Sequence, residues 1–168
     1  MNLKIRTLPD TQLRQKSTSV PKENLQDTST QVFIDELVEA MKVYDGIGIA
    51  APQVGHNIRM VVIDKDAFKR YTIIEGSINP KKSVVLVNPT WERISRKTNW
   101  DTEGCLSVPD TYGKVKRYTN IRLSALTREG SPLIMETSGT LARVIQHEVD
   151  HLDGVLFVDK AKNIFTHK

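Results

Sequence analysis

The sequence predicts an α+β fold in which antiparallel or mixed β-sheets pack around a central α-helix, with another helix nearer the N-terminus. Apolar residues recur at helical spacing in two segments, and several short β-branched runs are separated by turn residues. The two kinds of segment do not alternate regularly, which disfavours a doubly wound parallel sheet. The length of 168 residues leads us to expect one domain over residues 1–168.

The first helix is predicted between Asp27 and Tyr44. Polar residues able to cap a helix precede this segment, and Gly46 follows it. Its apolar residues recur every three or four positions, as expected for an amphipathic helix. They are Phe33, Leu37, Ala40, Met41 and Tyr44.

Four short segments are predicted to be strands, because they are rich in β-branched or aliphatic residues and are bounded by Asn, Pro, Gly or Asp. They are Ile58–Ile63, Val84–Val87, Ile121–Leu126 and Leu133–Met135. Residues 64–82 are polar and basic with scattered apolar side chains. We therefore expect a long connection between the first two strands.

The second helix is predicted to begin after Ser138, which can cap it, and to end before Gly154. Its apolar residues fall on more than one helix face, which indicates a buried helix at the centre of the fold. They are Leu141, Ala142, Val144, Ile145, Val149 and Leu152.

Composition and charge exclude several classes of protein. No apolar run approaches the ~20 residues that span a bilayer, and the N-terminus lacks the apolar core of a secretory signal. We therefore expect a cytoplasmic protein with no membrane or DNA partner, and a single cysteine suits that reducing compartment. The net charge is +4, with its densest cluster at Lys114, Lys116, Arg117 and Arg122. We interpret this cluster as a solvated basic face, with contact to RNA or a ribosome as the weaker alternative.

The strongest chemical signal lies in the second predicted helix, in the sequence His147-Glu148-Val149-Asp150-His151. Two histidines four positions apart share one helix face and can bind one metal ion, with a glutamate beside them. This is the HExxH arrangement of zinc hydrolases. A buried helix without a metal would have to desolvate two imidazoles and two carboxylates without compensation, which disfavours a purely structural role.

A third protein ligand must come from elsewhere in the chain. The extended protease pattern HExxHxxGxxH is matched at Gly154, but Phe157 stands in place of its third histidine, and no glutamate follows His151. Cys105 is the natural candidate, because a thiolate binds borderline-soft metals and its EGCLS setting is typical of a tight turn. Two other roles compete for this cysteine: it could be a small buried hydrophobic residue, or a nucleophile paired with a histidine.

A third segment, GIGIAAPQ over residues 46–53, combines two glycines with a glutamine. The glycines would let the backbone approach a ligand closely, and Gln53 can donate a hydrogen bond. The segment also matches the dinucleotide fingerprint GxGxxA. That fingerprint requires a strand before the loop and a helix after it, whereas here a helix precedes it and Pro52 follows. A dinucleotide site is therefore disfavoured.

In this order and at these separations, GIGIAAPQ, EGCLS and HEVDH resemble the three signature motifs of the peptide deformylase family. The segments LPD near the N-terminus and QHEVDHLDGVLF extend the similarity over most of the chain. The resemblance implies a hydrolase that removes the N-formyl group from the N-terminal methionine of newly made polypeptides and releases formate. Its partners would be N-formylmethionyl nascent peptides, with transient ribosome contact.

The resemblance also implies a metal centre. Its ligands would be Cys105, His147 and His151, in agreement with the argument from ligand chemistry, and Glu148 would be the catalytic acid and base. The resemblance implies that the cofactor is one divalent ion, Fe²⁺ in cells. A Cys/His/His set also suits Zn²⁺, Ni²⁺ or Co²⁺, which are possible in purified protein.

By the same resemblance, two donors would stabilise the negative charge of the reacting oxygen: the side-chain amide of Gln53 and the backbone N–H of Leu106. Gly48 would form a backbone hydrogen bond to an extended peptide. Ile47 and Val144 would help to line the methionine pocket.

Polar residues next to the motifs are expected to support the site. Arg143 is expected to pair with a carboxylate such as Glu103. Glu103 and Asp150 are expected to orient a ligand histidine or to anchor the loop that carries Cys105.

Three alternatives remain: a structural zinc or RNA-binding module, a metalloprotease, and an inactive relative. Glu148 argues against the first, because only catalysis needs this non-ligand. The missing downstream ligand argues against the second, and a competent residue at every assigned position argues against the third. The segment after Phe157, VDKAKNIFTHK, is shorter than the C-terminal helix linked with ribosome docking in many family members, so docking through such a helix is not expected.

Overall fold

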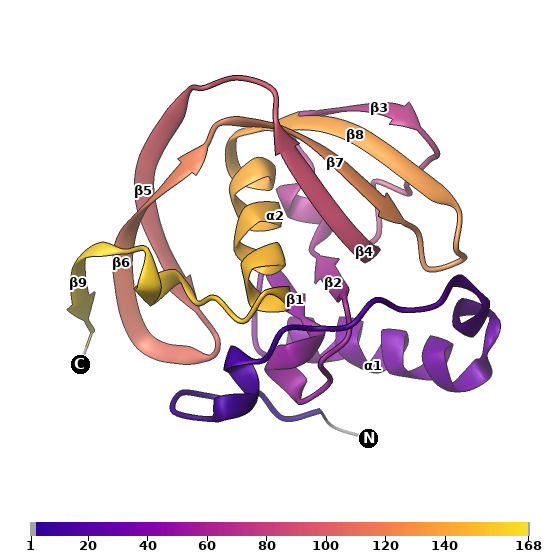
Figure 1. The fold of residues 1–168 in the computed structure, drawn as a ribbon, viewed down its shortest axis with the longest axis horizontal. Coiled ribbons are helices and arrows are strands. Elements are labelled where there is room, and N and C mark those ends of the chain that lie inside the picture. Colours follow the sequence, from indigo (N-terminus) through magenta and orange to yellow (C-terminus); the bar gives the residue numbers. More distant parts are fainter. Residues whose placement is uncertain (1–2, 168) are drawn as a thin grey trace.

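The structure, a computed structural model, describes residues 3–167, which form two β-sheets and two α-helices. Figure 1 shows helix α2 between the smaller sheet, on the left, and the larger sheet. Every pair of named strands is antiparallel, so the predicted α+β class with antiparallel sheets is confirmed. Neither of these helices is long and apolar enough to cross a membrane.

The larger sheet has the strand order β1-β2-β4-β7-β8-β3, and the smaller sheet has the order β5-β6-β9. The strands of the larger sheet are β1 Gly48–Ala50, β2 Met60–Ile63, β3 Tyr71–Glu75, β4 Val84–Arg93, β7 Asn120–Leu126 and β8 Pro132–Ser138. The strands of the smaller sheet are β5 Thr98–Cys105, β6 Val108–Tyr118 and β9 Lys162–Thr166. The four predicted strands correspond to β2, β4, β7 and β8.

Helix α1 covers Thr28–Val43, which confirms the first predicted helix. Its buried face includes Ile34, Leu37 and Met41, and these side chains belong to a hydrophobic cluster with residues of β1, β2 and β4. The helical spacing of its apolar residues therefore reflects packing against one side of the larger sheet.

Helix α2 covers Gly139–Leu152 and follows β8 directly. Ser138 occupies the N-cap position, although its side chain forms no capping hydrogen bond. Leu141, Ile145 and Leu152 are buried in a cluster with strands of the larger sheet, and the helix also contacts β6 of the smaller sheet. Residues on the rest of the helix surface can therefore reach the smaller sheet.

Two expectations about strands are wrong. The predicted connection over residues 64–82 contains β3, which is an edge strand paired with β8. Only Tyr71 and Ile73 of this strand are half-buried, so it shows little apolar pattern. The prediction also lacks β1, β5, β6 and β9. Strand β1 has only three residues, β5 and β6 contain glycine and charged residues, and β9 is exposed along its whole length.

Candidate metal centre and active site

A cleft of about 750 Å³ is lined by residues of β1, the β5–β6 hairpin and α2. Eight of the nine residues predicted for the site line it: Ile47, Gly48, Gln53, Cys105, Leu106, Val144, His147 and Glu148. The ninth, His151, is almost fully buried next to the cysteine. The fold thus brings together residues from three separate segments of the chain.

The three predicted metal ligands lie close enough to hold one ion. One ligand atom from each of Cys105, His147 and His151 lies within 4.8 Å of the others, and Cys105 Sγ is 3.3 Å from His151 Nε2. Zinc lies ~2.3 Å from sulfur and ~2.0–2.1 Å from nitrogen, which at tetrahedral angles places two such ligand atoms roughly 3.5 Å apart. The donor set and its spacing therefore fit one tetrahedral divalent ion.

Helix α2 supplies two of these side chains because residues four apart lie one above the other on a helix. The ring centroids of His147 and His151 are 5.1 Å apart. The carboxylate of Glu148 instead lies against β1, at Gly48. A Cβ atom at position 48 would come within 2.6 Å of Glu148 Oε1, so only glycine leaves room for the carboxylate in this position.

Cys105 stands at the end of β5, where a two-residue turn leads into β6. The backbone N–H of Ser107 donates to its Sγ at 3.4 Å, and Gln53 Nε2 lies 3.6 Å from the same atom. Burial raises the pKa of the thiol, but the charges and hydrogen bonds of His151 and His147 outweigh burial and bring this pKa well below its ordinary value. The thiolate, which is the metal-binding form, is therefore favoured.

Gln53 lies in a short 3₁₀ helix, Ala51–Val54, directly after β1. Its Oε1 accepts a hydrogen bond from the backbone N–H of Ala50 at 2.8 Å, and its Nε2 donates to Ser107 Oγ at 3.2 Å. Ser107 is fully buried, and the sequence did not predict it as a site residue. These two bonds hold the Gln53 amide nitrogen beside the cysteine sulfur.

Glu148 is a buried carboxylate with one unused oxygen. Only 3% of the residue is exposed, and its Oε2 has no hydrogen-bond partner within residues 3–167. Burial raises the pKa of this carboxyl group, although the nearby His147 and His151 act in the opposite direction. A carboxylate in such a setting is suited to accept a proton.

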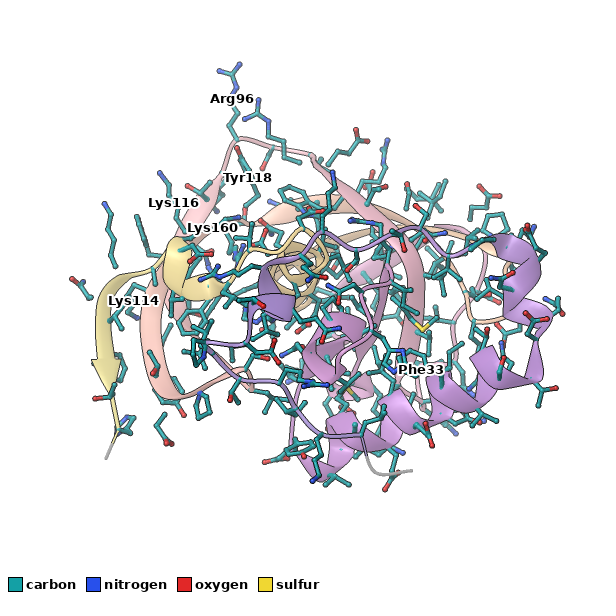
Figure 2. All side chains as sticks on the ribbon, turned by 60° about the horizontal axis from the view of Figure 1, so that its bottom comes forward. Phe33, Arg96, Lys114, Lys116, Tyr118 and Lys160 are labelled. Carbon is teal, nitrogen blue, oxygen red and sulfur yellow. The ribbon has the colours of Figure 1, made fainter. Side chains whose placement is uncertain are left out.

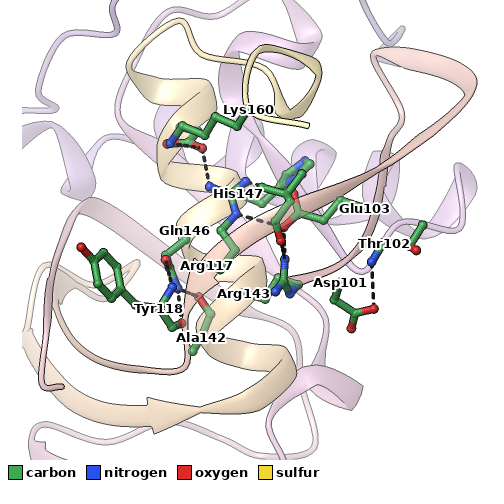
Figure 3. A network of polar contacts seen from close by, with 12 residues as sticks. Asp101, Thr102, Glu103, Arg117, Tyr118, Ala142, Arg143, Gln146, His147 and Lys160 are labelled. Atoms are coloured by element: carbon green, nitrogen blue, oxygen red, sulfur yellow. Dashed lines mark hydrogen bonds and ion pairs between the residues drawn. The ribbon is translucent and has the colours of Figure 1, made fainter. Parts of the chain in front are cut away.

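Glu103 is the centre of a buried ion-pair network behind His147 (Figure 3). Its Oε2 lies 2.9 Å from His147 Nδ1, and Arg117 donates to both carboxylate oxygens at 2.9 Å. Arg143 donates to Oε1 at 2.7 Å, which confirms the predicted pairing. Burial acts to raise the pKa of Glu103, but hydrogen bonds from His147 and Arg117 lower it far below its ordinary value. Since Nδ1 of His147 is engaged by this carboxylate, Nε2 is left for a metal.

The interpretation of the basic cluster as a solvated face is wrong for Arg117. Only 4% of this residue is exposed, and its Nη1 donates to Asp150 at 2.6 Å. Lys160 donates to the other oxygen of that carboxylate at 2.9 Å. Strand alternation could have revealed this, because Arg117 shares a face of β6 with Val115, which is fully buried.

Comparison with known proteins identifies the family. The sequence profile described as Polypeptide deformylase matches residues 2–166. Peptide deformylase 2 of Vibrio cholerae is 46% identical over 158 residues, which cover 94% of this chain and 84% of that protein. A crystal structure of a Synechococcus elongatus peptide deformylase in complex with actinonin matches with a TM-score of 0.82 and 37% identity, over 96% of this chain and 79% of that one. A Met-Ala-Ser-bound crystal structure of a peptide deformylase from Acinetobacter baumannii also matches with a TM-score of 0.82, at 30% identity over 95% of this chain and 98% of that one. The chain therefore belongs to the polypeptide deformylase family.

Proposed function

We propose that this chain is a metal-dependent peptide deformylase that hydrolyses the N-formyl group of N-formylmethionyl peptides and releases formate. Membership of the family supports the reaction. The observation that carries the residue assignment is the convergence, in one cleft, of a Cys/His/His ligand set and a buried glutamate with a free oxygen. A purely structural metal site would have no use for that glutamate.

Cys105, His147 and His151 would hold one divalent ion. Such an ion supplies Lewis acidity toward the formyl carbonyl and lowers the pKa of water. A thiolate with two imidazoles suits Fe²⁺, Zn²⁺, Ni²⁺ and Co²⁺ alike, so the ligand set alone does not select the metal. The resemblance to the family favours Fe²⁺ in cells.

Glu148 would carry the proton through the reaction. Its free Oε2 accepts a proton as water attacks the formyl carbon, and it then gives this proton to the departing amine. The new C–O bond and the broken C–N bond yield formate and a peptide with a free N-terminal methionine. Cys105 is disfavoured as a nucleophile, because a ligand thiolate has its lone pairs committed to the ion.

Gln53 and Leu106 would stabilise the negative charge that develops on the formyl oxygen. The Gln53 amide is fixed at both ends, at Oε1 by Ala50 and at Nε2 by Ser107, so it needs little reorganisation during the reaction. The backbone N–H of Leu106 lies in the turn after Cys105, at the lining of the same cleft. Loss of one such donor typically costs ~10²–10³ in rate.

The substrate would lie extended along β1. This strand is at an edge of the larger sheet, so the backbone of Gly48 can hydrogen-bond to an added strand. Ile47 and Val144 line the cleft and would contact the methionine side chain. The Met-Ala-Ser tripeptide bound to the Acinetobacter baumannii relative is the product expected from a formylated substrate of this kind. Main-chain recognition implies tolerance for many residues after methionine.

We further propose that residues 1–168 form one catalytic domain. This is supported by the contacts of both sheets with α2, which connect the two sheets through one helix. The domain would act in the cytoplasm on nascent chains, in transient contact with the ribosome.

The test measures formate release from formyl-Met-Ala-Ser by protein reconstituted anaerobically with Fe²⁺ or Ni²⁺. Wild type, Glu148→Ala and the exposed control Glu23→Ala are compared at equal measured metal content. We expect turnover by wild type and the control, and a loss of at least ~10²-fold in Glu148→Ala. Folded, metal-loaded wild type without turnover would overturn the proposed activity, and cleavage within unformylated peptides would indicate a protease.

A further inference from the structure

The smaller sheet has a second face that the proposed deformylation does not use. Alternate side chains along a strand point to opposite faces of a sheet. Val115 and Arg117 of β6 are buried on the side of α2, so Lys114 and Lys116 point away from it and are exposed. Figure 2 shows both lysines at the side of the molecule, along β6. We call this surface the outer face; its largest side chains are Trp100, Lys114, Lys116, Lys162 and Phe165, and Tyr112 lies where this face borders the cleft.

Within residues 3–167, the lysines of the outer face have no carboxylate partner. The cross-strand pairs on this face contain no acidic residue. They are Thr98 and Tyr118, Trp100 and Lys116, Thr102 and Lys114, Gly104 and Tyr112, Tyr112 and Phe165, and Lys114 and Lys162. None of the three lysines forms an ion pair with a residue in the described part of the chain. Like charges directly opposite each other, such as Lys114 and Lys162, destabilise a sheet. An anionic partner would offset this repulsion.

Aromatic rings lie between these cations. Trp100 is 45% exposed and Phe165 is 43% exposed, so both rings are accessible from solvent. The rings of Tyr112 and Phe165 are nearly parallel, with centroids 5.7 Å apart, and Lys162 Nζ lies 5.1 Å from the centre of the Trp100 ring. Antiparallel sheets that present aromatic rings can bind unpaired nucleic-acid bases by stacking, and neighbouring lysines attract the phosphates.

We propose that the outer face binds single-stranded RNA, with bases stacked on Trp100 and Phe165 and with phosphates at Lys114, Lys116 and Lys162. A single strand fits better than a duplex, because the bases of a duplex are stacked on each other and cannot reach the rings. The metal ligands and Glu148 lie on the other side of the sheet, so RNA and a peptide substrate can bind together. The proposal does not depend on deformylase activity.

The test uses the intact chain with Trp91→Phe, in which Trp100 is the only tryptophan, because the sequence contains two. A 12-nucleotide oligo(U) should quench its fluorescence saturably. With three phosphate contacts, log K should fall with log salt at a slope of about −2, which is roughly a 20-fold weakening between 50 and 200 mM salt. Anisotropy of a labelled oligo(U) with wild type gives the same affinity without relying on the Trp91 substitution.

Two double variants provide the matched comparison. Lys114→Glu with Lys116→Glu should weaken oligo(U) binding at least about 10-fold. Lys81→Glu with Lys82→Glu makes the same change in net charge on exposed residues before β4 and should leave binding nearly unchanged. Both double variants should release formate from formyl-Met-Ala-Ser at the wild-type rate. If wild type lacks that activity, an unchanged thermal midpoint shows instead that both variants are folded.

A third variant tests stacking. Trp100→Ala should weaken oligo(U) binding about 5-fold or more while leaving the binding of heparin, a polyanion without bases, unchanged. Equal losses in the two double variants would overturn the proposal, because they would show only general attraction to a basic protein. Failure to bind oligo(U) at 50 mM salt would also overturn it. So would binding to phosphatidylserine vesicles without binding to oligo(U). Equal weakening of heparin binding and oligo(U) binding in Trp100→Ala would overturn the stacking of bases on this ring.

Discussion

The larger sheet packs aliphatic side chains against α2, whereas the smaller sheet meets the same helix with a buried network of charges. Leu86, Ile121 and Leu123 are fully buried on the first side, while Glu103 and Arg117 are almost fully buried on the second. Apolar packing is insensitive to direction, but hydrogen-bonded ion pairs hold specific atoms in place. Both sides therefore stabilise the fold, but the charged side also sets the orientation of the helix residues in the cleft.

The largest change in stability is expected when the charged side of this comparison is broken. Arg117→Met leaves Glu103 and Asp150 buried with reduced compensation, so the free energy of unfolding should fall by about 3–5 kcal/mol. Urea denaturation at a fixed metal load measures this change. Arg122→Met removes two exposed ion pairs of the larger sheet, with Glu92 and Glu136, and should leave the urea midpoint nearly unchanged. Equal effects of the two substitutions would show that the buried network has no special role.

On the apolar side, Leu86→Ala should lower the free energy of unfolding by about 2–5 kcal/mol, because it removes a fully buried side chain. The folded fraction should still bind one metal ion per chain with wild-type affinity. Denaturation and metal analysis on the same samples measure the two quantities. Weak metal binding by the folded variant would mean that the division of roles between the two sheets is wrong.

Gly48→Ala tests the contact between β1 and α2 at the site itself. The added methyl group overlaps Glu148 Oε1 and must displace that carboxylate. A misplaced catalytic group costs about 10²-fold, so kcat for formate release should fall by that factor while metal content remains at the wild-type level. Wild-type kcat would show that the position of this carboxylate is not important for the reaction.

Glu103→Gln keeps the shape of the side chain but removes its charge next to His147. Loss of such an outer-shell partner typically weakens metal binding by about 10–100-fold. Competition with a chelator, with circular dichroism to verify folding, measures this change, and Glu92→Gln on the exposed end of β4 is the control. An unchanged metal affinity would contradict the orienting role of Glu103.

The smallest effect is expected at the exposed ion pair between Arg14 and Asp159, which joins two short 3₁₀ helices, Thr11–Arg14 and Phe157–Asp159. Burial acts to raise the pKa of Asp159, but hydrogen bonds from Arg14 and from the backbone N–H of Leu156, together with the charges of Arg14 and Lys160, lower it below its ordinary value. A lowered folded-state pKa contributes stability above the unfolded value of roughly 3.9, and this contribution is lost as the pH falls through the folded value. The small difference in thermal midpoint between wild type and Arg14→Gln should therefore shrink below about pH 4. A difference independent of pH would assign the effect to packing.

The sequence predicts best where a local pattern determines the structure. The spacing of apolar residues predicts both α-helices, and three short motifs name the residues that line the cleft. The smaller sheet escapes prediction because its buried face contains Glu103 and Arg117, whose burial is stable only after the strands and α2 have come together. Strand β3 escapes because an edge strand buries little. Most of the supporting network depends on contacts between distant segments. The sequence suggested only the pair of Arg143 and Glu103 and a supporting role for Asp150.

The cysteine at the end of β5 and the two histidines of α2 belong to elements that lie about 40 residues apart along the chain. An ion bound by all three would cross-link the hairpin to the helix and close that length of chain into a loop, much as a disulfide does. The catalytic ion would then also restrain the hairpin that forms one wall of the cleft. Removal of the ion should make the turn after Cys105 more accessible to proteases and to hydrogen exchange, even where the rest of the fold persists.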